Sequence, residues 1–166
     1  MPIERKKLDA LLSQVCENIG GDWVLLGGAL ALLSFDDTRM TEDIDLFARD
    51  QAKAPEKLRK LFAEGRSLGL NEEQLNSAAS FFFGEIPSWQ EELVLLRSEK
   101  NGRIWRPTLT ALAYMKLKRG SRIDLQDIRN ATEAFGKEEF DFKKFRKWSS
   151  EALLLNFIKH RSTLGL

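Results

Sequence analysis

Two aspartates in the first third of the chain, Asp43 and Asp45, are the residues with the clearest chemical potential. They flank Ile44 in an alternating acidic and apolar segment, which predicts a β-strand with both carboxylates on one face. Neighbouring carboxylates repel each other unless a cation lies between them. Mg²⁺ binds such oxygen ligands and keeps coordination positions for phosphate. We therefore predict a metal site here, with an exposed strand face bearing two solubilising acids as the simpler interpretation.

A glycine pair, Gly27 and Gly28, precedes these aspartates in the chain. It follows the apolar run Trp23–Leu26, which predicts a buried strand, and it precedes Ala29–Leu33, which predicts a buried helix. Glycine lets a phosphate approach the backbone, and a helix N-terminus offers amide groups to an anion. A glycine pair alone is more often only a tight turn. Beside a carboxylate pair, it supplies the anion-binding half of a metal–triphosphate site.

These residues carry a family resemblance. Gly27–Leu30 followed by Arg39–Asp45 resembles the signature of the nucleotidyltransferase superfamily of DNA polymerase β, and more narrowly that of small bacterial nucleotidyltransferase-like proteins, including members linked to type IV toxin–antitoxin systems. Pro87–Leu93 and Leu109–Ile128 resemble later segments of the same small proteins. The resemblance implies an α+β fold, with a mixed β-sheet core flanked by helices and a C-terminal helical lobe.

The resemblance also implies a function and a set of site residues. The function is transfer of a nucleoside monophosphate from an NTP to a hydroxyl acceptor on a protein or an RNA. Asp43 and Asp45 would be the catalytic residues and would bind Mg²⁺ or Mn²⁺. The implied nucleotide-binding residues are Gly27, Gly28, Arg39, Thr41 and Lys116.

The sequence departs from the family pattern at the next strand. Active members generally place a third carboxylate there, but the predicted strand Ala78–Phe83 contains no acid, and Glu85 and Glu92 lie beyond it. The alternative function is therefore a catalytically degenerate binding module that acts in a toxin–antitoxin pair. Further along, Asp124 and Asp127 fit a helix capping box, with Asp124 at the N-cap, better than they fit a catalytic role.

The remaining pattern divides the chain into an α/β core over residues 1–106 and a helical lobe over residues 107–166. The expected core elements are a helix ending at Gly20, a helix from Pro55 to Gly65, and a hairpin at Asn101-Gly102 between strands Glu91–Arg97 and Arg103–Trp105. The expected lobe elements are helices capped by Thr108, Asp124 and Asp141, the last running on to Phe157.

Composition limits the other function classes. The 166 residues carry a net charge of +1, with one cysteine and one histidine, which excludes a disulfide framework and a zinc-finger cluster. The longest uncharged stretch has 13 residues, from Trp23 to Phe35, whereas a membrane-spanning helix needs about 20. We expect a cytoplasmic protein without a membrane partner. Residues 97–130 carry nine basic and three acidic side chains, so a basic nucleic-acid-binding surface is a third hypothesis.

Overall fold

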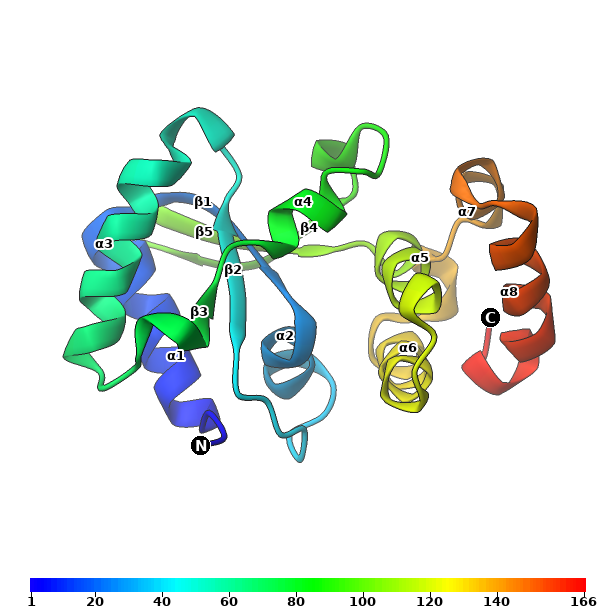
Figure 1. The fold of residues 1–166 in the computed structure, drawn as a ribbon, viewed down its shortest axis with the longest axis horizontal. Helices are drawn as coiled ribbons and strands as arrows, with labels where there is room; N and C mark the ends of the chain where they lie inside the picture. The colour runs from blue at the N-terminus through cyan, green and yellow to red at the C-terminus, as the bar shows by residue number, and fades with distance from the viewer.

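The computed structural model describes all 166 residues and is built around one mixed β-sheet (Figure 1). Its five strands lie in the order β3-β2-β1-β5-β4. Strand β1 pairs antiparallel with β2 and parallel with β5, and β3 lies parallel to β2. The strands are β1 (Gly21–Leu26), β2 (Ile44–Ala48), β3 (Leu75–Asn76), β4 (Leu93–Glu99) and β5 (Gly102–Pro107).

Helices surround this sheet and form the predicted C-terminal helical part, so the α+β fold class is confirmed. Figure 1 shows the last four helices gathered beyond the end of β5, while α1 and α3 lie at the opposite end of the molecule. The helices are α1 (Arg5–Gln14), continued by a π-helical turn over Val15–Ile19, α2 (Gly27–Ser34), α3 (Ala54–Ser67), α4 (Ala79–Phe83), α5 (Leu109–Arg119), α6 (Arg122–Phe135), α7 (Phe142–Trp148) and α8 (Glu151–Leu164). None of them combines the length and the apolarity needed to cross a membrane.

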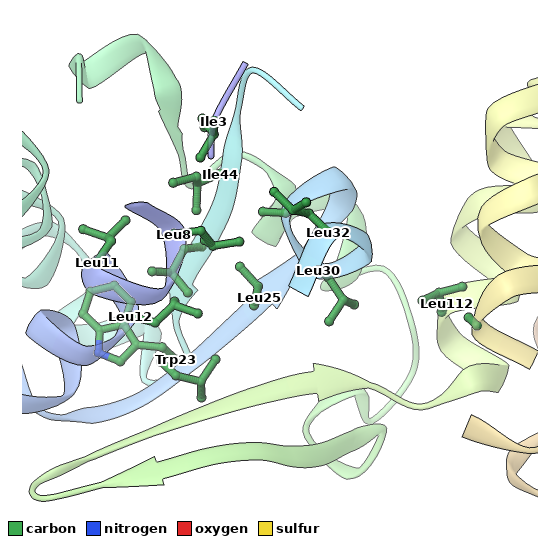
Figure 2. Packing of buried hydrophobic residues seen from close by; sticks show 14 of the residues in the cluster. Ile3, Leu8, Leu11, Leu12, Trp23, Leu25, Leu30, Leu32, Ile44 and Leu112 are labelled. Carbon is green, nitrogen blue, oxygen red and sulfur yellow. The ribbon is translucent and has the colours of Figure 1, made fainter. Parts of the chain in front are cut away.

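The hydrophobic core is continuous from the sheet into the helical part. Figure 2 shows Leu8, Leu11 and Leu12 of α1 against Trp23 and Leu25 of β1. The same cluster of 28 buried residues extends to lobe side chains including Leu112, Ile128, Phe145 and Phe157. Each fully buried side chain of this kind stabilises the fold by about 2 kcal/mol. The division at residue 106 stays a prediction, and the two parts share one core.

Local signals set several helix ends as predicted. The Thr108 hydroxyl accepts a hydrogen bond from the Ala111 amide at 3.2 Å and caps α5, which ends at Gly120 with a φ of 66°. Asp141 caps α7 by accepting from the Lys144 amide at 3.1 Å. The β4–β5 hairpin is also present, and Gly102 is its first β5 residue. A Cβ on Gly102 would lie 2.4 Å from the Cα of Cys16, so this position needs glycine.

The predicted strand over Ala78–Phe83 is wrong, because this segment forms α4. Phe83 is buried and packs against Phe47 and Trp89, whereas Phe81 and Phe82 are exposed. A short apolar run does not by itself distinguish a strand from a helical turn. The Asn76 side chain accepts a hydrogen bond from the Ala78 amide at 2.9 Å and turns the chain into α4 immediately after β3.

Two helix boundaries also differ from expectation. Helix α3 continues past Gly65 to Ser67, and Gly65 is buried where a Cβ would lie 2.5 Å from the Leu75 side chain, so it serves packing rather than termination. The single last helix expected after Asp141 is two helices. Ser150 separates them, since its hydroxyl accepts from the Leu153 amide at 3.2 Å and caps α8.

Candidate nucleotide-binding site

The glycine turn and Asp45 lie against each other at the end of β1. The β1–β2 register pairs Leu26 with Asp45, and α2 begins at the next residue, Gly27. Gly27 has a φ of 66°, and a Cβ there would lie 2.0 Å from Asp45 Oδ2. Backbone conformation and the carboxylate therefore both require glycine. This is the juxtaposition of acid and glycine turn that the metal–triphosphate hypothesis needs.

Gly28 makes a second close approach, to the segment that precedes β2. A Cβ on Gly28 would lie 2.6 Å from the Thr41 hydroxyl oxygen and 3.7 Å from an Arg39 guanidinium nitrogen. The Thr41 hydroxyl donates to the backbone carbonyl of Asp43 at 3.0 Å. Arg39 and Thr41 thus pack at the start of α2, where they order the segment leading to the two aspartates.

The two aspartates differ in their surroundings. Asp43 is exposed just before β2, whereas Asp45 is half-buried. Burial raises the pKa of Asp45, and the charge of Asp43 raises it further, while a hydrogen bond from Asn76 and the charges of Arg119 and Lys116 act in the opposite direction. Asp45 Oδ1 accepts from Asn76 Nδ2 at 2.8 Å, which leaves Oδ2 facing Gly27.

The strand that follows the aspartates is β3, and its residue beside Asp45 is Asn76. The β2–β3 register pairs these two residues. The position where the family pattern expects a third acid therefore holds an amide, and no group of three His, Cys, Asp or Glu side chains is placed to bind a metal. Two carboxylates still fit Mg²⁺, which binds proteins through one or two carboxylates and takes its other ligands from water and phosphate.

A cavity of about 600 Å³ opens beside this turn, within the size range of small-molecule sites. Its lining includes Gly27, Asp45 and Asn76 from the core, and Lys116, Lys118 and Arg119 from α5. The acidic and cationic groups thus face one space, which lies between the sheet and the helical part. An anion bound there would meet the start of α2 on one side and the last turn of α5 on the other.

Lys116 lines the cavity but is held in a buried ion-pair network. Its Nζ lies 2.7 Å from Asp127 Oδ2 and 3.6 Å from Asp124 Oδ1, and its side chain is only 8% exposed. The other oxygen of Asp127 lies 3.3 Å from Arg39 Nε. Asp127 therefore joins two of the predicted nucleotide-binding residues, and direct contact between Lys116 and a nucleotide stays a prediction.

The capping box of α6 uses different residues from those expected. Ser121 is the N-cap, and its hydroxyl accepts from the Asp124 amide at 3.1 Å, while Asp124 Oδ2 accepts from the Ser121 amide. Burial would raise the pKa of Asp124, but hydrogen bonds from Arg119 and Ser121 and the charge of Lys116 lower it to about 2.

Sequence reasoning missed the role of Asp127. The residue is not part of the first turn of α6 but lies one turn further, in the network with Lys116 and Arg39. Its spacing of three from Asp124, which places both carboxylates on one helix face, was the available signal.

The basic segment at residues 97–130 is neutralised within the fold. Eight of its nine basic side chains contact a carboxylate, and Arg122 is the exception. The pairs are Arg97–Asp9, Lys100–Glu17, Arg103–Asp22, Arg106–Glu139, Lys116–Asp127, Lys118–Glu85, Arg119–Asp124 and Arg129–Glu133. Each of these pairs offsets one positive charge, so the segment carries less free positive charge than its sequence alone suggests, and the third hypothesis loses support.

In this mixed sheet a glycine turn follows β1 and the aspartate pair lies at the start of β2, as the resemblance to nucleotidyltransferases predicts. Residues 6–160 match the family described as "Nucleotidyltransferase of unknown function (DUF6036)", and the chain belongs to that family.

One solved structure with a similar fold is that of an antigenic nucleotidyltransferase-like protein from Paracoccidioides brasiliensis. It is 19% identical in sequence, with a TM-score of 0.58, and the match covers 99% of this chain and 93% of the other. At this identity the likeness supports the fold alone. A comparison with curated proteins gives no match.

Proposed function

We propose that this protein binds an NTP with Mg²⁺ or Mn²⁺ and transfers its nucleoside monophosphate to a hydroxyl group of a protein or an RNA. The observation that carries the proposal is the contact between the Asp45 carboxylate and Gly27 at the start of α2. It brings a carboxylate and a glycine turn to one cavity, together with Lys118 and Arg119. Membership of a nucleotidyltransferase family supports the reaction class.

Each part of the site has a separate task in this reaction. The backbone amides at Gly27 and Gly28 would bind phosphate oxygens at the N-terminus of α2. Asp43 and Asp45 would hold the metal, which when bound offsets the negative charge of the phosphates. Arg119 would add positive charge near the same phosphates. The acceptor oxygen would then bond to the α-phosphorus and release its proton to water, while the bond from that phosphorus to pyrophosphate breaks and pyrophosphate leaves with the electron pair of that bond.

Transfer of label from α-³²P-labelled NTPs tests the proposal. The protein is incubated with Mg²⁺, each NTP and candidate protein or RNA acceptors, and labelled acceptor is measured. We expect labelling by the native chain and its loss in Asp45→Asn. Asp37→Asn is the matched control, because Asp37 is an exposed aspartate outside the cavity. Labelling that persists in Asp45→Asn, or is absent with the native chain, contradicts the transferase proposal.

A second function is favoured by Asn76. An amide beside Asp45, where the family pattern expects an acid, suits a module that binds nucleotide without turnover and acts as one half of a toxin–antitoxin pair. This alternative predicts nucleotide binding without label transfer, and a stable complex with the product of a neighbouring gene. Co-purification of that product separates the two functions when the transfer assay is negative. Both functions would operate in the cytoplasm, where NTPs and Mg²⁺ are present.

A further inference from the structure

The cavity beside Asp45 has an aromatic side that the phosphate chemistry does not use. Phe82 of α4 lines it and is 67% exposed, although a phenylalanine side chain stabilises the fold more when it is buried. From α5, Tyr114 and Met115 line the same space. We propose that Phe82 binds the nucleobase of the NTP by stacking, which makes α4 the base-recognition element; this rests on the proposed function.

Helix α4 is anchored so that Phe82 keeps its position. The next residue, Phe83, is fully buried, with its ring centroid 6.2 Å from that of Phe47 and 5.6 Å from that of Trp89. The preceding residue, Phe81, is 79% exposed and does not line the cavity. Of the three consecutive phenylalanines, one anchors the helix, one faces the cavity and one lies outside it. A ring fixed by its neighbour needs little ordering when a ligand binds.

Lys118 and Glu85 also line the cavity and could form hydrogen bonds with the edge of a nucleobase. Lys118 Nζ donates to Glu85 Oε2 at 3.2 Å, and this contact joins the chain after α4 to helix α5. Both residues line the cavity and are about half exposed, and Lys118 Nζ also lies 5.3 Å from the Tyr114 ring centroid. An ammonium donor and a carboxylate acceptor can bind the carbonyl and amino groups of a base edge. The cavity thus has a phosphate end at Gly27 and groups suited to a nucleoside around Phe82.

Comparing nucleotides with inorganic tripolyphosphate isolates the contribution of the base. Dissociation constants of the four NTPs and of tripolyphosphate are measured calorimetrically with Mg²⁺, for the native chain, Phe82→Ala, Phe82→Tyr and Phe81→Ala. Loss of one base-stacking contact weakens binding by about tenfold to a hundredfold. We expect that loss for NTPs with Phe82→Ala, unchanged tripolyphosphate binding, and near-native values for Phe82→Tyr and Phe81→Ala.

The outcomes separate this proposal from the proposed function. The stacking proposal is overturned if Phe82→Ala weakens NTP binding no more than Phe81→Ala does. It is likewise overturned if Phe82→Ala weakens NTP binding and tripolyphosphate binding equally. It is also overturned if the native chain binds tripolyphosphate as tightly as any NTP, although the phosphate site would then stand. If the native chain binds neither ligand, both proposals fail. Thermal unfolding of each variant checks that the fold is intact, which is expected because Phe82 is exposed.

Discussion

Arg39 and Asp127 are 88 residues apart in the sequence, yet Arg39 Nε lies 3.3 Å from Asp127 Oδ1. This contact ties the segment that leads to Asp43 onto helix α6. Because the second oxygen of Asp127 binds Lys116 at 2.7 Å, one buried carboxylate holds both a residue that precedes β2 and a residue of α5. Asp127 therefore links Arg39 to Lys116 across the fold.

Removing that carboxylate should cost substantial stability. Asp127→Asn leaves the buried Lys116 ammonium with only the more distant Asp124, and breaking a buried pair on one side costs about 3 kcal/mol. Urea unfolding followed by circular dichroism measures the change. The control is Glu133→Gln, which breaks an exposed pair with Arg129 and should cost less than about 0.5 kcal/mol. Equal losses in the two variants would show that the network contributes little.

Gly27→Ala should impair both folding and nucleotide binding. The new Cβ would meet Asp45 Oδ2 and would also require an alanine at a φ of 66°. Gly69→Ala is a matched control, because Gly69 has a φ of 72° but nothing within 4 Å of an added Cβ. The control should lose about 1 kcal/mol from backbone strain alone. Gly27→Ala should lose more in urea unfolding and should also weaken NTP binding. A loss no larger than that of Gly69→Ala would contradict the close contact.

The Asp124 carboxylate should make the folding stability of the protein depend on pH in the acidic range. Its pKa of about 2 in the folded chain lies below the ordinary value of 3.8, so ionisation stabilises the fold above pH 4 and this contribution fades as pH falls toward 2. The shift corresponds to about 2 kcal/mol. The difference in unfolding free energy between the native chain and Asp124→Asn should be larger at pH 6 than at pH 3. A difference that does not change with pH would exclude this linkage.

Metal removal should weaken nucleotide binding through the aspartate pair. EDTA is expected to reduce the NTP affinity of the native chain, because the triphosphate would then face Asp43 and Asp45 without an intervening cation. Asp43→Asn should raise the Mg²⁺ concentration needed for half-maximal binding by at least about tenfold. Isothermal titration at several Mg²⁺ concentrations measures this, with Asp37→Asn unchanged. Identical Mg²⁺ dependence in the native chain and Asp43→Asn would remove Asp43 from the metal site.

The site was predictable where its signals are local. Alternation around Ile44 and the glycine pair after an apolar run indicated the β2 strand and the β1–α2 turn, and the structure brings Asp45 to Gly27 as the hypothesis required. The cap residues Thr108 and Asp141 were also predictable, because the side chain of each accepts a hydrogen bond from the backbone amide three residues later.

The rest depended on contacts between distant parts of the chain. Strand β3 has only two residues and forms through its pairing with β2, so it has no hydrophobic periodicity that could predict it. The sequence therefore did not show which residue lies beside Asp45. The ion pairs of the basic segment could not be predicted for a related reason. Its partners, such as Asp9 and Glu139, come from other elements, and sequence charge alone does not reveal which cations are already paired.

The shared core has a consequence for how the molecule can be dissected. Leu30 of α2 belongs to the same buried cluster as Leu112 of α5 and Phe157 of α8, so truncation after residue 106 would expose apolar faces on both fragments. Calorimetry of the intact chain should then record one melting transition rather than two. The C-terminal segment could accordingly be exchanged for another only if the apolar face it covers were redesigned with it.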